Sequence, residues 1–187
     1  MVDMTDNLRR VLARRHKVRI VESSHLPAAV VLLLLKQGGE YHVLFTRRTE
    51  NLTHHRGQIS FPGGACQKED CSLLATALRE CHEEMGIAPR DVAVLGELDD
   101  TLTYVSHYHI TPFVGIIPWP YPLKPNPVEI AEVITAPLLA LRDKASFREE
   151  VSVEEGIEVT VPFYTYKGKV IWGATARILK QLLALLP

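Results

Sequence analysis

Cysteine is scarce in this sequence. The chain of 187 residues has three cysteines, Cys66, Cys71 and Cys81, and no two of them form a C-x-x-C pair. An odd set without that spacing argues against a disulfide scaffold and against a zinc site built from thiolates. Because such cysteine usage is typical of a reducing compartment, we expect the protein to be cytoplasmic.

An excess of charge of one sign and a long apolar run are also missing. The formal net charge is −1, with acidic and basic residues interspersed, so we expect no nucleic-acid and no membrane partner. The apolar run at residues 28–35 is far shorter than the ~18 residues that a membrane helix needs. The N-terminal residues show no signal-peptide pattern, which agrees with the expected location.

The size and composition predict one domain. A chain with 47% hydrophobic and 23% charged residues can bury a substantial core, and we expect residues 1–187 to form a single domain. Residues 1–26 are expected to be a basic helical extension, in which Leu8, Val11 and Leu12 mark the apolar side. Its basic residues are Arg9, Arg10, Arg14, Arg15, Lys17 and Arg19. A solvated amphipathic helix is favoured over attraction to phosphate or to an acidic surface.

Strand and helix patterns alternate along the chain and predict a mixed α/β fold. Predicted strands cover residues 28–35, 41–47, 57–61, 92–98, 110–117, 128–134, 159–166 and 170–172. Predicted helices cover residues 71–85, 137–141 and 175–186. The first two strands form a hairpin that we expect at an edge of the sheet. The proline-rich residues 118–127 predict a loop near a binding cleft rather than a linker between domains.

The helix at residues 71–85 carries the most informative pattern. Its apolar residues recur at helical spacing, and its acids gather nearly opposite them. The apolar residues are Leu74, Leu78, Cys81 and Met85, and the acids are Glu80, Glu83 and Glu84. These acids lie near the negative end of the helix dipole, where they need a positive partner. Hard dications such as Mg²⁺ or Mn²⁺ take oxygen ligands together with phosphates, so the pattern indicates a metal site for phosphate chemistry.

The same segment resembles the signature of the Nudix hydrolases, G-x5-E-x7-R-E-U-x-E-E-x-G-U, in which U is a bulky apolar residue. The matching residues are Arg79, Glu80, Cys81, Glu83, Glu84, Gly86 and Ile87. The first half of the signature departs from the family. Counted from Gly64, the acid is Asp70, and eight residues rather than seven separate it from Arg79.

This departure resembles the coenzyme A pyrophosphatase branch, whose signature is longer by one residue and has Asp at the shifted position. Residues 44–64 also resemble that branch's additional motif, L-L-T-x-R-S-x-x-L-R-x-H-x-G-x-V-x-F-P-G-G. Thr49 replaces a Ser of this motif and Thr53 replaces an Arg. Weaker similarities extend the resemblance to about residues 27–186.

The resemblance implies a Nudix α/β/α sandwich and a hydrolysis that needs Mg²⁺ or Mn²⁺. It implies that Glu80 and Glu84 bind the metal, with Glu83 a further ligand or one that acts through water. Arg79 is implied to orient a carboxylate by charge-assisted hydrogen bonds. The general base stays open among Glu80, Glu83, Glu129 and Glu132.

Coenzyme A (CoA) is the substrate that the resemblance implies, with 3′,5′-ADP and 4′-phosphopantetheine as products. The expected substrate-binding residues are Arg47, Arg48, His55, Arg56, Gln58, Gly63 and Gly64. Of these, the three arginines are the candidates for the 3′-phosphate, although surface ion pairs explain each of them equally well. His54 is a further candidate to offset Thr53. A zinc site at His54, His55, His107 and His109 is disfavoured because no tetrahedral spacing is present.

Other functions stay open. The same signature serves enzymes for ADP-ribose, nucleoside diphosphate sugars and dinucleoside polyphosphates. A non-catalytic module that senses a nucleotide is another class, but such modules usually lose one or more of the acids that this chain keeps. Nudix proteins are often dimers, so the resemblance also leaves a homodimer open.

Overall fold

The computed structural model describes residues 3–21, 24–51, 55–103, 105–154 and 157–186. The helices are α1 (Met4–Arg14), α2 (Leu73–Met85), α3 (Leu138–Arg142) and α4 (Gly173–Leu185). The strands are β1 (Leu26–Gln37), β2 (Glu40–Arg48), β3 (Ile59–Ser60), β4 (Gly63–Ala65), β5 (Ala93–Glu97), β6 (Thr101–Leu102), β7 (Tyr108–Ile116), β8 (Ile130–Pro137), β9 (Phe147–Glu154), β10 (Ile157–Tyr166) and β11 (Lys169–Ile171). Single 3₁₀ turns cover Pro89–Asp91 and Lys144–Ser146.

The larger sheet is mixed and has β1 at its centre. Its main strand order is β3-β2-β1-β7-β5, and β4, β6 and β8 pair with β1, β7 and β2 respectively. The strand β1 is antiparallel to β2 and β4 but parallel to β7. The expectation that the β1–β2 hairpin lies at an edge of the sheet is therefore wrong, because β7 and β8 flank it on its two sides.

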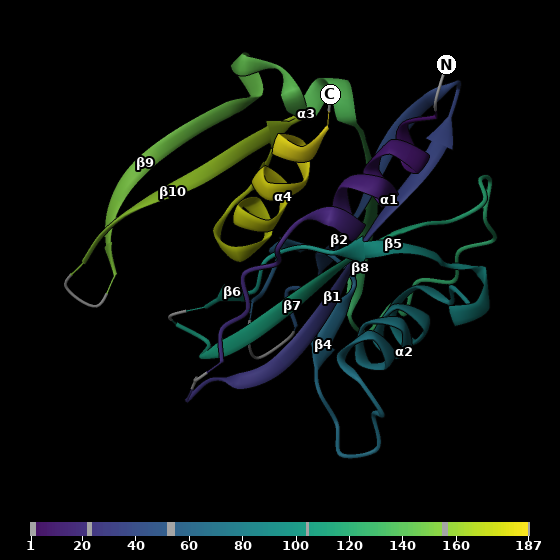
Figure 1. The fold of residues 1–187 in the computed structure, drawn as a ribbon, viewed down its shortest axis with the longest axis horizontal. Coiled ribbons are helices and arrows are strands. Elements are labelled where there is room, and N and C mark those ends of the chain that lie inside the picture. The colour runs from purple at the N-terminus through teal and green to yellow at the C-terminus, as the bar shows by residue number, and fades with distance from the viewer. Residues whose placement is uncertain (1–2, 22–23, 52–54, 104, 155–156, 187) are drawn as a thin grey trace.

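Two apolar cores cover the two faces of this sheet. Because side chains alternate along a strand, Leu32 and Leu34 of β1 enter one core while Val31 and Leu33 enter the other. The first core is closed by α1 and α4, and the second by α2. Figure 1 shows this layering, with α2 on one side of the sheet and α1 and α4 on the other. The predicted α/β/α sandwich with a mixed sheet is confirmed.

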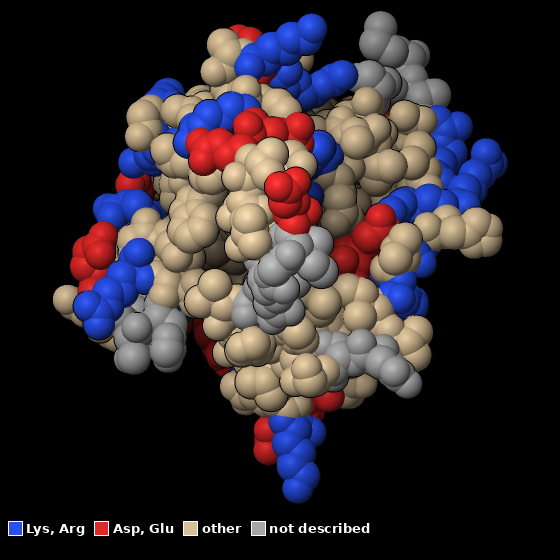
Figure 2. Space-filling view, turned by 90° about the vertical axis from the view of Figure 1, so that its left-hand side faces the viewer, with Lys and Arg blue, Asp and Glu red and all other residues tan. Residues whose placement is uncertain are grey.

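The smaller sheet is a long hairpin with a short third strand, in the order β11-β10-β9. Its hairpin projects from the rest of the molecule beside α4 (Figure 1). Figure 2 shows the side on which it projects, where the surface is hollowed near the centre of the view. Positive and negative side chains are interspersed on this side rather than gathered into one patch of a single sign.

The helix α2 has a capping residue at each end, Ser72 at its start and Gly86 at its end. The hydroxyl of Ser72 accepts a hydrogen bond from the backbone N–H of Ala75 at 3.1 Å, which caps the first turn. Gly86 ends the helix in the left-handed conformation with φ 70°, and its N–H donates to the carbonyl of His82. Both caps fix the register of the helix against the sheet.

The segment after α1 is attached to the sheet through ion pairs. Arg15 contacts Asp99, and the Lys17 ammonium lies 2.8 Å from Glu97 and 2.9 Å from Asp100. The backbone N–H of Ile20 also donates to Asp100. The basic residues nearest the sheet therefore neutralise acids of this chain instead of forming a free anionic-ligand surface.

Asp100→Asn should weaken this attachment. Burial opposes ionisation of Asp100, but hydrogen bonds from Lys17, His109, Ile20 and Thr111 outweigh it and lower the pKa of the carboxyl. Removing one partner of a buried ion pair costs about 3 kcal/mol, so the midpoint of urea unfolding at pH 7 should fall.

The pH dependence checks this cause. A carboxyl with a lowered folded pKa stabilises the protein above its unfolded value of 3.8 and loses that contribution as pH falls through the folded value. The difference between Asp100→Asn and wild type should therefore shrink below pH 3.8. Arg10→Ala, an exposed change on α1, is the matched control and should leave the midpoint unchanged.

The proline-rich segment between β7 and β8 contains neither helix nor strand, as predicted. It runs along the C-terminal end of α2, where Lys124 N–H donates to Met85 O and Asn126 N–H donates to Glu84 O. This path brings Glu129 to the site described below. Among the described residues, no helix is long and apolar enough to cross a membrane.

Candidate active site

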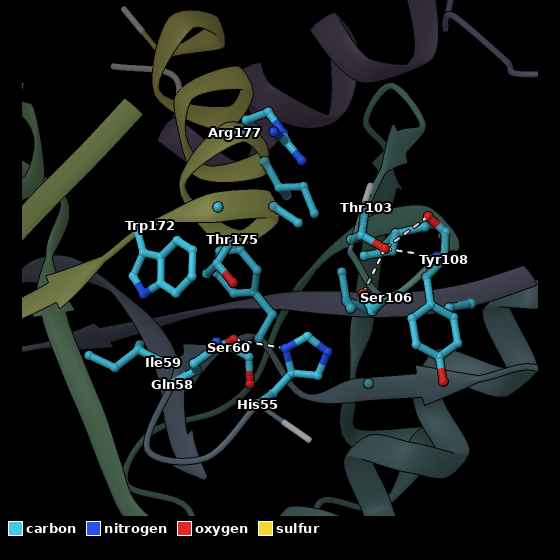
Figure 3. Close-up of a pocket in the computed structure, with 18 of the residues that line it drawn as sticks. His55, Gln58, Ile59, Ser60, Thr103, Ser106, Tyr108, Trp172, Thr175 and Arg177 are labelled. Carbon is cyan, nitrogen blue, oxygen red and sulfur yellow. Dashed lines mark hydrogen bonds between the residues drawn. The ribbon is translucent and has the colours of Figure 1, made fainter. Parts of the chain in front are cut away.

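A cavity of about 1160 Å³ reaches from α2 on one side of the sheet to the start of α4 on the other. Near α2 its lining includes Arg48, His55, Gln58, Gly63, Gly64, Glu80, Glu84 and Glu129. The rest is lined by residues of β9 and β10, the β6–β7 connection and the first turns of α4. In Figure 3, Trp172 and Thr175 lie on one side of the cavity, and Thr103, Ser106 and Tyr108 lie on another.

Glu84 is the buried carboxylate of the site. Glu84 is only 2% exposed, because α2 packs against β4 and this strand covers that flank of the helix. One carboxylate oxygen accepts the backbone N–H of Gly63 at 3.3 Å, and the other lies 3.5 Å from Arg48 Nη1. Burial raises the pKa of Glu84 to about 8 despite these two partners. Its negative charge is therefore incompletely compensated by the protein.

Glu80 lies one turn earlier, beside the backbone of Gly64. A Cβ atom at position 64 would stand 2.6 Å from Cδ of Glu80, so only glycine leaves the carboxylate its place. Burial raises the pKa of Glu80, and the negative charges of Glu83 and Glu129 act in the same direction. Arg79 opposes this shift through a hydrogen bond of 2.8 Å from its Nη1 to Glu80.

Arg79 ties the loop before α2 to the helix. Its Nε and Nη2 donate to the two oxygens of Asp70 at 2.9 and 3.0 Å, which is a bidentate pair. Its Nη1 also donates to Glu83, and its Nη2 donates to the carbonyl of Ala65. The arginine thus holds Glu80 without itself lining the cavity.

Asp70 stands at the position of the first acid of the signature and contacts Arg79 directly. Its carboxylate accepts the N–H of Gln67 and the hydroxyl of Thr76, both at 2.9 Å, in addition to the Arg79 guanidinium. These hydrogen bonds hold the pKa of Asp70 far below its usual value, and the hydrogen bond from Arg79 has the largest effect. Asp70 therefore reaches Arg79 although eight residues separate the two in sequence, and a turn precedes it in which Asp70 N–H donates to Gln67 O. These contacts hold the Arg79 guanidinium, and no such part was assigned to Asp70 from the sequence.

The four candidate general bases lie in different surroundings. Glu80 and Glu129 line the cavity, whereas Glu83 and Glu132 do not. The side chain of Glu83 is 52% exposed and is bound to Arg79. Glu132 accepts from Arg47 and Lys169 at 3.1 and 2.9 Å, and hydrogen bonds from these two cations lower its pKa. The geometry therefore favours Glu80 and Glu129 as the groups that can reach a bound water.

The expected substrate-binding residues divide between two cavities. Arg48, His55, Gln58, Gly63 and Gly64 line the large cavity, and Nδ1 of His55 lies 2.9 Å from Oε1 of Gln58.

Arg47 and Arg56 line a smaller cavity of about 400 Å³, together with Lys169. Successive side chains of β2 point to opposite faces, which separates Arg47 from its neighbour Arg48. Thr53 and His54 lie outside the described residues.

The wall near α4 was not assigned from the sequence. Trp172, Thr175 and Arg177 line the cavity and belong to the junction between β11 and α4 (Figure 3). In the sequence, this segment lies only within the weaker similarities that extend to about residue 186. The helix itself was predicted from its pattern, but its place beside β10 and β6 depends on tertiary contacts that have no local signal.

The donor set near α2 fits a hard dication. Glu80 and Glu84 offer carboxylate oxygens, and Glu129 adds a further negative charge beside both of them. In the described ranges, no three His, Cys, Asp or Glu side chains already enclose a metal position. The pair Glu80 and Glu84 suits Mg²⁺, which binds through one or two carboxylates and keeps several waters.

Comparison with known proteins places the chain in a family. The profile of the NUDIX domain matches residues 24–154, so the chain belongs to the Nudix family of pyrophosphohydrolases, which generally need divalent metal ions. Over 154 residues it is 39% identical to an uncharacterized Nudix hydrolase named NudL from Photorhabdus laumondii, with 82% of each chain covered. A protein of the same name from Yersinia pestis is 38% identical over 154 residues, which cover 82% of this chain and 77% of that protein.

Solved structures agree with the fold. A NUDIX hydrolase from Alicyclobacillus acidocaldarius superposes with a TM-score of 0.57 at 16% identity, over 88% of this chain and 93% of that chain. A MutT/nudix family protein from Enterococcus faecalis gives a TM-score of 0.57 at 14% identity, over 97% and 67% of the two chains. An Ap4A hydrolase from C. elegans gives 0.51 at 15% identity, over 61% and 81%. These likenesses concern the fold alone.

Proposed function

We propose that this Nudix hydrolase cleaves the pyrophosphate bond of CoA or a CoA derivative, with Mg²⁺ or Mn²⁺ as its metal. The products are 3′,5′-ADP and 4′-phosphopantetheine, or its acylated form. One observation carries the proposal: the residues that resemble the CoA branch and the residues of the Nudix signature line the same cavity. His55 and Gln58 represent the first set there, and Glu80 and Glu84 the second.

The chain's own residues define the reaction site. Glu80 and Glu84 would hold the dication, which supplies charge neutralisation at the diphosphate and a lowered pKa for an attacking water. Arg48 lines the cavity and contacts Glu84, and its Nε is buried without a hydrogen-bond partner in the described part of the chain. A buried unpaired donor is costly, so Arg48 is suited to receive a phosphate oxygen. Glu80 or Glu129, which both line the cavity, would take the proton of the water.

A substrate panel tests the proposal. Purified protein with Mg²⁺ or Mn²⁺ is incubated with CoA, acetyl-CoA, ADP-ribose and diadenosine tetraphosphate, and the products are separated by chromatography. We expect CoA or its thioester to have the highest kcat/KM and to give 3′,5′-ADP. Preferred turnover of ADP-ribose or of the dinucleotide would assign the cavity to another nucleoside diphosphate derivative. Binding without turnover of any of them would instead indicate a sensing module.

Arg56→Ala should affect recognition of the 3′-phosphate. Arg56 lines the smaller cavity with two other cations, and this cavity shares Gln58, Ile59 and Trp172 with the large one. A charge-assisted contact is worth about 2 kcal/mol, so KM for CoA should rise roughly tenfold or more. KM for dephospho-CoA should change little.

Steady-state kinetics with both substrates give the comparison. Arg90→Ala is the control, since that side chain is 89% exposed and lies in the 3₁₀ turn after α2. Equal changes for the two substrates would remove Arg56 from the 3′-phosphate site.

A further inference from the structure

A large part of the cavity lies away from the residues that act in the reaction proposed above, and its lining is mainly apolar. Its wall is built from Val161 and Phe163 of β10, Trp172 before α4, and Ile178 within α4. Val161 and Phe163 are two positions apart on one strand, so they face the same side. All four residues lie beyond residue 154, where the match to the NUDIX profile ends.

Apolar side chains at this part of the cavity are exposed to solvent. Val151 of β9 is 71% exposed, Val105 is 95% exposed and Trp172 is 47% exposed, and all three line the cavity. Isolated apolar residues on a surface are ordinary, but several around one cavity are typical of a site for an apolar ligand. The exposed groups are therefore available to a bound molecule.

Away from the α2 end, the charged residues of the lining are Glu150 and Arg177, and both have partners within the protein. Glu150 accepts from Arg148 Nε at 2.8 Å, and Arg177 Nη2 donates to the carbonyl of Leu102 at 2.8 Å. Hydrogen bonds also fix the conformation of the connection between β6 and β7. Tyr108 N–H and the Ser106 hydroxyl both donate to Oγ1 of Thr103, at 2.7 and 2.8 Å (Figure 3). We call the part of the cavity that Val161, Phe163, Trp172 and Ile178 line the compartment. It is a preformed and mainly apolar space.

The size of the cavity exceeds the needs of a diphosphate. Small-molecule sites usually have volumes of about 300 to 1,000 Å³, and this one has about 1160 Å³. A diphosphate at Glu80 and Glu84 occupies only the α2 end. Because the space is continuous, a substrate held there can extend a long substituent toward Trp172 and Phe163.

We propose that this compartment binds the pantetheine arm and the acyl chain of a CoA thioester, so that the enzyme prefers acylated CoA. The inference rests on the CoA activity proposed above. The gem-dimethyl group and the acyl chain pack against Val161, Phe163 and Trp172. The hydroxyl of Thr175, which lines the same space, is available to an amide of the arm.

The test compares kcat/KM for acetyl-, butyryl-, hexanoyl- and decanoyl-CoA in three proteins: wild type, Trp172→Ala and Phe163→Ala. Each buried methylene should raise kcat/KM of the wild type by about two- to fourfold until the compartment is full. Both variants should flatten this increase, with a loss roughly tenfold larger for hexanoyl-CoA than for acetyl-CoA.

Controls separate packing from folding. Leu139→Ala removes another exposed apolar side chain, 67% exposed on α3, and should keep the wild-type series. Thermal melting checks each variant. If Phe163→Ala does not fold, Trp172→Ala decides the test, because the half-exposed Trp172 contributes less to the core.

Two failures are distinguishable. A wild type that hydrolyses CoA with the same kcat/KM for every chain length overturns the acyl compartment and leaves the CoA activity standing. Retention of the wild-type series in Trp172→Ala overturns it as well. Turnover of another nucleotide without any CoA thioester overturns the proposed function, and the compartment assignment with it.

Discussion

Glu84→Gln is expected to lower kcat about 10³-fold, since a metal ligand contributes several kcal/mol of charge stabilisation to the transition state. Gln has the same shape and can still accept the N–H of Gly63, so the fold should be kept. What it cannot supply is the negative charge that draws a dication into the cavity. Activity at saturating substrate and Mg²⁺ measures the loss.

The same variant should stabilise the metal-free protein. A carboxyl whose folded pKa is raised from 4.5 to about 8 holds more protons in the folded chain than in the unfolded one. Its cost therefore grows as pH rises from 4.5 and is complete above about pH 8. The unfolding temperature of Glu84→Gln should exceed that of wild type at pH 8.5 and match it near pH 4. A fully active and unstabilised Glu84→Gln protein would remove Glu84 from the metal site.

Gly64→Ala is expected to lower kcat about 10²-fold, the loss that follows when a reacting group is displaced by about 1 Å. The new Cβ would stand 2.6 to 2.8 Å from the carboxylate atoms of Glu80, and the flexible side chain must move away. The backbone at Gly64 has no left-handed φ, so the stability of the fold should change by less than about 1 kcal/mol. Kinetics and urea unfolding together give the result.

Substitutions at two other glycines, Gly63 and Gly39, serve as comparisons for this prediction. Gly63→Ala should destabilise the fold by about 4 kcal/mol or more, because its Cβ would lie 2.3 Å from the carbonyl oxygen of Ala29 and its φ is +153°. Gly39→Ala, in the β1–β2 turn, meets no atom within 4 Å and should keep the wild-type kcat. If Gly64→Ala keeps the wild-type kcat too, the place of Glu80 against this backbone is irrelevant to catalysis.

The helix at the site could be predicted because its signals are local. Apolar spacing, the capping Ser72 and the terminal Gly86 all lie within α2 or next to it. The helical arrangement also brought Glu80, Glu83 and Glu84 to one side of the helix. It could not show that Glu84 is buried while Glu83 is exposed, because that difference depends on β4, which packs on one flank.

The sheet was harder to predict because its pairings are distant in sequence. The strand β1 pairs in parallel with β7, as in the register Leu32↔Val114, and this places the hairpin at the centre. Nothing within residues 28–47 encodes that neighbour. The three-residue β4 is too short for a pattern, and it pairs with β1 across the glycines that the site needs.

The strand β9 was also missed, for a different reason. In its sequence, Phe-Arg-Glu-Glu-Val-Ser-Val-Glu, Glu149 interrupts the face that Phe147, Val151 and Val153 share, so the alternation is weak. It forms because it pairs with β10 along its whole length, as in Val161↔Glu150. The wall near α4 depends on this hairpin, so the compartment beside Trp172 could not be predicted either.

Binding of Mn²⁺ or Mg²⁺ measured by titration calorimetry tests the central claim most directly, with 3′,5′-ADP present to supply a phosphate. We expect the wild-type protein to bind the dication and Glu84→Gln to bind it at least about tenfold more weakly, which corresponds to 1.4 kcal/mol. Absence of any binding to the wild type, or equal affinity in the two proteins, would contradict the assignment of Glu84 and its neighbour Glu80 as the metal-holding pair.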